Sequence, residues 1–361
     1  MSSRSRSKRH HTVPRFHLRG FASPDGMLRQ VDLRTGSRRL VSVSDASVVR
    51  DFYTVELEDG TRSDRWEKRF AEAESRVAPM VRAATREVFW SPSPIELAHL
   101  TTWIALQFLR GPDHRRLLTQ IRAQTLVMTV GMGGLAYLRH AMSEGLQRAV
   151  SAEEAEAVWD DIHSPGGPAV RVTGSEHIHS IRGSLGQAAN FIGHRSWHRI
   201  RFDRRSLAIN DSPVGLIPAE DHHPARGVGL ANAGAVTIAL DRRTLLWLDH
   251  PTVGNGDYPP STLAARLHNQ SVVFGAERFV YMHPDDADPT EGLALPREER
   301  SLFAPAGVYD FANRDRPLAD VLEQIGEHDF DAEPDAIIAD YTWPIPGYEP
   351  HSTGPWSSST H

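Results

Sequence analysis

The sequence predicts an α+β fold, in which a helical central region packs with a mixed or antiparallel sheet formed by N-terminal and C-terminal strands. Residues 65–197 show helical periodicity of their apolar positions. Residues 28–50 and 198–285 instead contain short runs that alternate or are continuously apolar, as strands do. The chain shows no internal repeat of solenoid type.

The N-terminal motif "RHHTVPRFHLRGF", at residues 9–21, predicts a short helix before the first strands. Thr12 is expected to cap this helix, and Gly20 to end it in the left-handed conformation. His10 and His11 would lie just before the helix, where backbone N–H groups favour an anion. In extended chain their side chains point to opposite sides, so we expect one histidine to face a site.

Turn and cap signals define the next elements. "LRQVDL" and "RRLVSVSD" read as strands joined by a turn at Thr35-Gly36. A helix that starts near residue 65 has an apolar face made of Trp66, Phe70, Ala73 and Val77. Two further helices begin at capping boxes, formed by Ser93 with Glu96 and by Ser151 with Glu154. A helix from about residue 113 through the apolar stretch 125–138, and another over 178–197, complete the central region.

The C-terminal part returns to strand-like patterns. Four strands are predicted from the segments "WHRIRF", "SLAIND", "GAVTIAL" and "TLLWLD". A helix around 261–274 and a last strand, "RFVYMH", follow. We therefore predict a flexible basic arm at residues 1–8, a single domain at 9–285, and an acidic, partly disordered tail at 286–361.

Composition excludes several kinds of chemistry. The chain has no cysteine, which rules out disulfides, thiolate metal sites and cysteine nucleophiles. Its only lysines are Lys8 and Lys68, so the last four-fifths of the chain offers no lysine for a phosphate-binding loop or a Schiff base. The basic N-terminus is followed by no apolar signal core, and the stretch 125–138 is too short to span a bilayer. We expect a cytoplasmic protein without a membrane segment.

Charge is distributed unevenly along the chain. Residues 1–40 carry nine arginines and Lys8 against Asp25 and Asp32, whereas the chain from Tyr281 onward is strongly acidic. A basic N-terminal region is typical of contact with nucleic acid. The alternative is that the protein's own acidic tail is its partner.

Two apparent motifs carry little weight. "VGMGGLA", at Val130 to Ala136, matches a dinucleotide-binding fingerprint, but the second strand that the fingerprint requires is missing, so close helix packing explains its glycines better. The pairs His177/His179 and His222/His223 lack a third ligand at zinc spacing.

The motif at residues 9–21 resembles the N-terminal signature of DUF4238, a bacterial domain-of-unknown-function family, in which His-His, Val-Pro and Leu-Arg precede a phenylalanine. The resemblance spans roughly residues 9–285 and continues at "DFY" (51–53), Glu67, Glu74, Gln107, Arg110, Pro112, Arg115, Asp211, Pro213 and Asn269. The chain departs from the family pattern at Thr12, His17 and Asn210. The resemblance implies a set of candidate site residues but does not indicate which activity they serve.

That set suits the hydrolysis of a phosphate ester. The expected catalytic residues are His10, His11 and Asp211, which offer an imidazole near neutral pH and a carboxylate at the end of a buried strand. The expected substrate-binding residues are Arg15, Gln107, Arg110, Arg115 and Asn269. A divalent metal held by histidine is compatible with this chemistry, and its identity stays open.

We interpret the chain as an uncharacterised-family protein whose leading function is a nuclease-like phosphodiester hydrolase, of defence or toxin type, acting on nucleic acid or another phosphate-bearing ligand. The alternative is a non-catalytic regulatory protein that binds an anion or nucleic acid, and a third is an interaction protein with no small ligand. Each residue also has a structural reading: Asp211 as a turn acid, Arg110 as a cation at a helix C-terminus, and Asn269 as a partner of backbone groups. Oligomeric state is not readable from the sequence.

Overall fold

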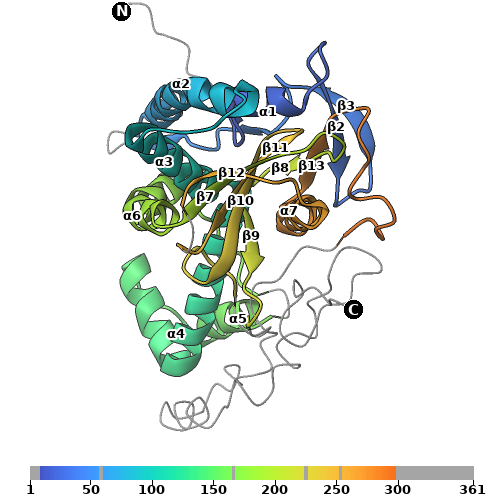
Figure 1. The fold of residues 1–361 in the computed structure, drawn as a ribbon. Coiled ribbons are helices and arrows are strands. Elements are labelled where there is room, and N and C mark those ends of the chain that lie inside the picture. The colour runs from blue at the N-terminus through green and yellow to red at the C-terminus, as the bar shows by residue number, and fades with distance from the viewer. Residues whose placement is uncertain (1–8, 57–59, 165–166, 223–226, 252–253, 298–361) are drawn as a thin grey trace, which may run out of the picture. The chain divides into compact units, whose positions relative to one another are not determined.

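A computed structural model describes residues 9–56, 60–164, 167–222, 227–251 and 254–297. The predicted basic arm at 1–8 and the greater part of the predicted acidic tail lie outside the described residues. The chain divides into two compact units. The first holds the described residues up to 115 and from 173 to 297, and the second holds those from 116 to 172. The fold is of the α+β class with antiparallel sheets, as predicted (Figure 1).

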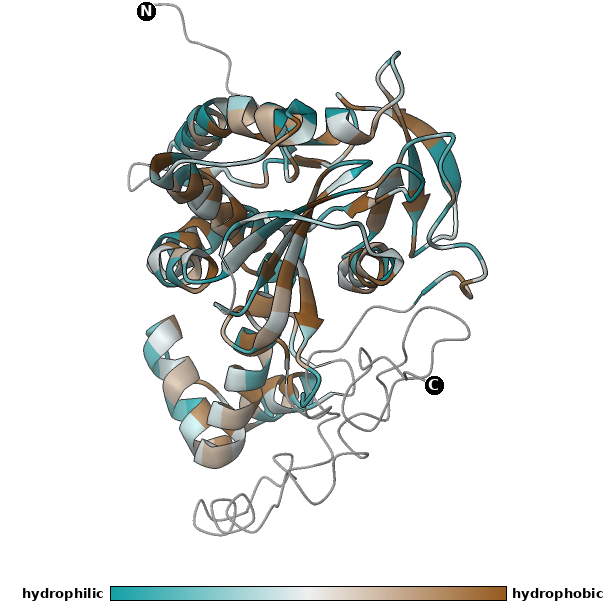
Figure 2. Cartoon of the chain, viewed as in Figure 1, coloured by the Kyte–Doolittle hydropathy of each residue, from teal (hydrophilic) through white to brown (hydrophobic). Residues whose placement is uncertain are grey.

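The central sheet of the first unit has five strands in the order β12-β7-β11-β10-β9. Their bounds are β7 Ser196–Arg201, β9 Gly215–Pro218, β10 Ala233–Asp241, β11 Thr244–Asp249 and β12 Gly256–Tyr258. All neighbours pair antiparallel except β12 and β7, which are parallel, so the sheet is mixed. Strand β10 is buried on both faces, which explains its nearly continuous apolar sequence (Figure 2).

Three helices cover one face of this sheet (Figure 1). They are α2 (Arg65–Arg86), α3 (Pro94–Arg110) and α6 (Gly174–Gly193). Val236, Ile238 and Leu240 of β10 pack with the helices in one core, while Ala235 and Ala239 point to the opposite face. Helix α3 begins with the predicted capping box of Ser93 and Glu96.

The second sheet combines N-terminal and C-terminal strands, as the sequence predicted. Its order is β3-β2-β13-β8, and all its pairings are antiparallel. The strands are β2 (Met27–Asp32), β3 (Arg38–Ser42), β8 (Ile209–Asn210) and β13 (Phe279–Met282). Helix α7 (Thr262–Gly275) contacts β8 of this sheet as well as β9 and β10 of the central sheet.

The N-terminal motif forms a strand and a short helix. Strand β1 (Arg9–His11) pairs antiparallel with β4 (Val48–Arg50), and β5 (Val55–Glu56) pairs with β6 (Arg62–Ser63). Helix α1 (Arg15–Leu18) continues into a 3₁₀ turn over Arg19–Phe21.

Two local predictions for this motif are wrong. Pro14 occupies the N-cap of α1 without a side-chain cap, because the Thr12 hydroxyl bonds to Ser47 instead. Gly20 does not adopt a positive φ, so it does not end the helix in the left-handed conformation. A Cβ there would lie 2.8 Å from the Leu240 carbonyl oxygen, and close approach to β10 is what requires glycine.

The second unit contains α5 (Ala152–Ile162) and most of α4 (Pro112–Leu146). Helix α5 begins with the predicted capping box of Ser151 and Glu154. The predicted continuous helix through 125–138 is interrupted, because Gly134 takes a non-helical conformation with φ 71°. Within the described part of the chain, no helix combines the length and apolar character needed to cross a membrane.

Candidate functional site

The two N-terminal histidines point in opposite directions, as extended chain requires. His10 is fully buried, its Nδ1 accepts a hydrogen bond from the Tyr53 backbone N–H (2.8 Å), and its ring stacks on the Tyr53 ring. This hydrogen bond leaves the proton of the neutral imidazole on Nε2. His11, the next residue of β1, is only partly buried and lines a pocket. Of the pair, His11 is the one that a ligand in this pocket can reach.

The pocket has a volume of about 370 Å³ and lies between the N-terminal motif and α2. Its lining residues are Arg9, His11, Arg15 and Phe16 from the motif and Glu67, Ala71, Glu74, Ser75 and Ala78 from α2. Each of these helix residues has another of them three or four positions away, so they share one face of α2. Other α2 residues, Phe70 and Val77, are buried in the main core, which holds the helix in this orientation.

Glu67 is the titratable group of the pocket whose protonation is tuned to neutral pH. Burial raises the pKa of Glu67 to about 7, the Arg110 guanidinium opposes this shift, and the nearby Glu74 carboxylate adds to it. The His11 backbone N–H donates a hydrogen bond to Glu67 and favours the charged form. Near pH 7 a population of Glu67 therefore carries a proton and another does not, as proton transfer in both directions requires.

Glu74 and Arg110 form an ion pair at the inner side of the pocket. Arg110 Nη1 lies 2.6 Å from Glu74 Oε1, and the Arg110 side chain is 1% exposed while that of Glu74 is 21% exposed. With its amide oxygen oriented toward donors, Gln107 accepts hydrogen bonds from Arg110 Nε (3.3 Å) and Trp103 Nε1 (3.2 Å). Gln107 and Arg110 thus hold Glu74 in place from beneath the pocket surface, and they are buried rather than open to a ligand.

His11 is neutral at pH 7 and has two competing partners. Burial and the adjacent Arg15 guanidinium lower the pKa of His11 to about 4. Its Nε2 lies 3.2 Å from both the Ser44 carbonyl oxygen and Arg15 Nε. One neutral tautomer donates to Ser44 and the other accepts from Arg15, so both bonds cannot form at once. Arg9, at the same rim, makes an exposed ion pair with Asp45 (2.6 Å).

Comparison with known proteins assigns the family. The family model described as "Protein of unknown function (DUF4238)" matches residues 9–286. The chain belongs to the DUF4238 family. No curated protein and no solved structure matches the chain. Every pocket residue named above lies within the matched part of this DUF4238 chain, and the match carries no activity with it.

Asp211, the expected carboxylate partner of the histidines, has a different set of neighbours in this DUF4238 protein. Its carboxylate accepts three backbone N–H hydrogen bonds, from Glu277 (2.8 Å), Arg278 (2.8 Å) and Phe279 (2.9 Å), at the start of β13. Asp211 is 3% exposed, and burial raises its pKa to about 7. It does not line the pocket that contains His11.

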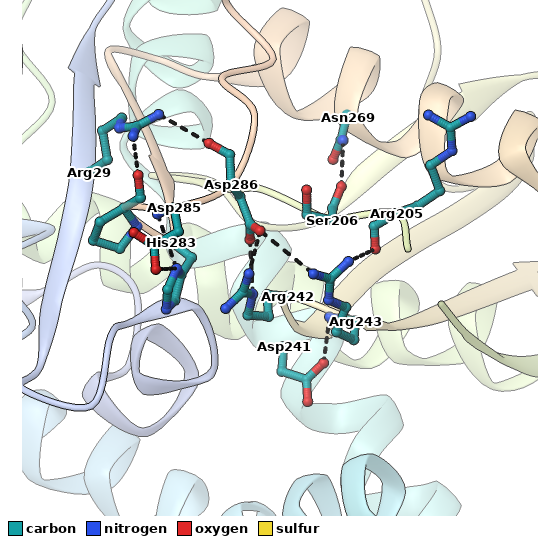
Figure 3. Close-up of polar contacts among 11 residues, drawn as sticks. Arg29, Arg205, Ser206, Asp241, Arg242, Arg243, Asn269, His283, Asp285 and Asp286 are labelled. Atoms are coloured by element: carbon teal, nitrogen blue, oxygen red, sulfur yellow. Dashed lines mark hydrogen bonds and ion pairs between the residues drawn. The ribbon is translucent and has the colours of Figure 1, made fainter. Parts of the chain in front are cut away.

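Asn269 and Arg115, two expected substrate-binding residues, also bond to backbone outside the pocket. Asn269 Nδ2 donates to the Ser206 carbonyl oxygen (2.9 Å), a contact drawn in Figure 3, and its Oδ1 accepts from the Ala208 N–H (3.0 Å). Arg115 donates to the Phe52 carbonyl oxygen (3.0 Å) and stacks over the Phe52 ring. Of the expected site residues, the structure brings His11 and Arg15 to the pocket and Gln107 and Arg110 beneath it.

The pocket of this DUF4238 chain also contains residues that the sequence did not assign to a site. Glu67 and Glu74 belong to the family resemblance, and their separation by seven positions puts both on one helical face. That spacing, next to an apolar face that fixes the helix, is the signal that could have selected them. Among the described residues, no group of three histidine or carboxylate side chains is arranged to hold a metal ion.

Proposed function

We propose that this DUF4238 protein is a phosphodiester hydrolase acting on nucleic acid, with the pocket between the N-terminal motif and α2 as its active site. One observation carries the proposal: Glu67, with a pKa of about 7, faces a pocket whose rim holds Arg9 and Arg15. A carboxyl group that exchanges protons at neutral pH, beside two guanidinium groups, suits the cleavage of an anionic ester.

The rim favours a phosphate group. Guanidinium groups donate paired N–H bonds that match the oxygens of a phosphate. Arg9 pairs with Asp45 and also donates to the Ser44 carbonyl oxygen (3.1 Å); both side chains of the ion pair are exposed, so the pair itself contributes little to stability. When Arg15 binds an anion, it gives up its hydrogen bond to His11, which is a neutral acceptor.

The proposed reaction transfers protons between the ester and two side chains. Water attacks phosphorus, the bond from phosphorus to the leaving oxygen breaks, and Glu67 gives its proton to that oxygen. His11 accepts the proton that the attacking water loses. A bound phosphate raises the pKa of both groups because its negative charge favours their protonated forms. That change strengthens His11 as a base and keeps Glu67 protonated until the bond breaks.

A pair of variants on α2 tests the proposal. Glu67→Gln keeps the shape of the side chain and removes the proton transfer, whereas Glu72→Gln changes an exposed residue of the same helix. With bis(4-nitrophenyl) phosphate and with labelled RNA and single-stranded DNA, we expect Glu67→Gln to lower kcat by about 10²–10⁴-fold and Glu72→Gln to leave it unchanged. Intact substrates after incubation of the wild-type protein with and without Mg²⁺, Mn²⁺ or Zn²⁺ would reject the proposal, as would full activity of Glu67→Gln.

A second function, non-catalytic binding of an anion or nucleic acid, is favoured by the low pKa of His11. A base with a pKa of about 4 is weak, and the arginines at the rim can bind phosphate without any chemistry. This alternative predicts that binding weakens steeply as salt concentration rises, with no turnover of any substrate.

A further inference from the structure

A second group of arginines lies beside the central sheet, outside the pocket. We call it the arginine surface, and its members are Arg19, Arg201, Arg204, Arg205, Arg242 and Arg243. They come from the 3₁₀ turn after α1, from the end of β7 and the loop that follows it, and from the turn between β10 and β11.

Backbone hydrogen bonds hold these segments together. The Arg242 N–H donates to the Gly20 carbonyl oxygen (3.0 Å), and the Arg242 carbonyl oxygen accepts from the Leu207 N–H (3.0 Å). The Arg243 carbonyl oxygen accepts from the Phe202 N–H (2.8 Å). The arginines therefore lie on three segments that are distant in the sequence and that backbone hydrogen bonds join.

The charge of this surface is only partly neutralised. Arg242 and Arg243 flank the carboxylate of Asp286, which is 6% exposed (Figure 3). Asp241 accepts a hydrogen bond from the Arg243 backbone N–H (2.8 Å). Asp203 is the remaining acidic residue in these segments and is exposed. Six arginines against three aspartates leave the surface positively charged.

Three of the guanidinium groups face solvent. Arg19, Arg204 and Arg205 are exposed, and the contacts found among the described residues give their side chains no acidic partner. In Figure 3 the Arg205 side chain extends away from the cluster around Asp286, while its carbonyl oxygen accepts from Arg243 Nη1 (2.7 Å). Exposed guanidinium groups without an acidic partner give this surface a positive potential that attracts anions.

The arginine surface continues from the pocket through α1. Arg15 lines the pocket, and Arg19 follows it by four residues, which is about 6 Å along a helix. Gly20 then touches β10, where even a Cβ would lie 2.8 Å from the Leu240 carbonyl oxygen. Arg15, Arg19 and Arg242 thus succeed one another along one path from the pocket to the turn between β10 and β11.

We propose that the arginine surface binds the sugar-phosphate backbone of the nucleic acid whose scissile phosphate occupies the pocket. The proposal rests on the function proposed above and adds how a long substrate is held. Successive phosphates of a strand are a few ångströms apart, so a path of arginines that leaves the pocket can engage neighbouring phosphates without reading bases. Docking to an anionic membrane is disfavoured because the segments that carry these arginines contain none of the exposed large apolar side chains.

The test uses charge reversal away from the pocket. We compare Arg204→Glu/Arg205→Glu with the control Arg62→Glu/Arg182→Glu, which reverses two exposed arginines on β6 and α6. The probe is a labelled single-stranded oligonucleotide of about 20 nucleotides, bound to protein that also carries Glu67→Gln, in about 50–200 mM NaCl. We expect the first pair to weaken binding at least about 10-fold and to reduce the salt slope by roughly 0.7–0.9 per lost phosphate contact, and the control to change neither.

Hydrolysis separates this proposal from the function on which it rests. With Glu67 intact, Arg204→Glu/Arg205→Glu should raise KM for the oligonucleotide about 10-fold and leave cleavage of bis(4-nitrophenyl) phosphate unchanged, since the small ester reaches only the pocket. Equal binding by both pairs would overturn the arginine surface even if the protein is a hydrolase. Weakened binding without any hydrolysis would overturn the hydrolase and keep the surface. The proposal would also be overturned if Arg204→Glu/Arg205→Glu lost binding to phosphatidylserine vesicles while its oligonucleotide binding stayed unchanged.

Discussion

Glu67 and Asp211 are carboxyl groups with the same raised pKa, and they differ in what surrounds them. Burial raises the pKa of each to about 7. Asp211 accepts three backbone N–H groups at the start of β13, whereas Glu67 accepts one, from His11, and faces the pocket. A raised pKa alone therefore does not distinguish a reactive carboxyl group from a structural one. What distinguishes them is the number of oxygen lone pairs that remain available to a ligand. Four predictions test the difference between side chains that face the pocket and side chains that bond to the backbone or are fully buried.

The largest expected effect is at Asp211. Asp211→Ala leaves three partly buried N–H groups at the start of β13 without their acceptor, so we expect the free energy of unfolding to fall by about 3–5 kcal/mol. Urea unfolding measures this loss. The rate of bis(4-nitrophenyl) phosphate cleavage per folded molecule should stay unchanged, and a large loss of that rate would place Asp211 in the chemistry after all.

The next effect is a gain of stability at Glu67. Its folded pKa lies above the unfolded value, so the folded state binds more protons between about pH 4.5 and 7, and stability is lost as pH rises through that window. Glu67→Gln removes this loss. We expect the variant to be more stable than the wild type by roughly 1–3 kcal/mol at about pH 8, and equally stable at about pH 4. Thermal unfolding of the variant and the wild type at both pH values measures this difference. A variant less stable than the wild type at high pH would show that ionised Glu67 supports the fold.

Asn269 should behave like Asp211 on a smaller scale. Asn269→Ala removes one donor and one acceptor that serve the backbone of Ser206 and Ala208. We expect a loss of about 1–2 kcal/mol in urea unfolding. Oligonucleotide affinity, measured on the folded variant, should match that of the wild type, and a weaker affinity would give Asn269 a part in binding.

The smallest effect distinguishes two histidines. The pKa of His11 and that of His17 are both lowered to about 4, by burial first in each case, but only His11 lines the pocket. A phosphate ion bound there should raise the pKa of His11 by about 1 unit and leave that of His17 unchanged, because His17 is fully buried. Two-dimensional NMR of the imidazole nitrogens during a titration with inorganic phosphate follows both residues. Equal shifts would indicate a general change in the protein rather than binding at the pocket.

The fold was predictable where its causes are local. The capping boxes at Ser93 and Ser151 start α3 and α5 as expected, and the apolar runs of β7, β10 and β11 form strands of the central sheet. The sequence showed less of β1, β9 and β12, because strands of three or four residues have no periodicity of their own and depend on their partners. Gly134 interrupts α4 within a stretch whose sequence predicts one continuous helix. The sequence does not distinguish a glycine that a helix tolerates from one that interrupts it with a positive φ.

The site was predictable only in part. Alternation along β1 explains why one histidine of the pair faces the pocket, and the i, i+7 spacing explains why Glu67 and Glu74 share it. Nothing in the sequence near Asp211 or Asn269 shows that backbone groups occupy their polar atoms, because the donors to Asp211 lie 66 to 68 residues away.

By itself the sequence determined the α+β class, the absence of cysteine chemistry, the uneven charge, and most helix starts. All of these depend on composition or on residues a few positions apart. The tertiary structure decided which polar side chains face a pocket and which bond to the backbone. Those partners come from segments such as β1 with α2, or β8 with β13, and only the folded chain brings them within hydrogen-bonding distance.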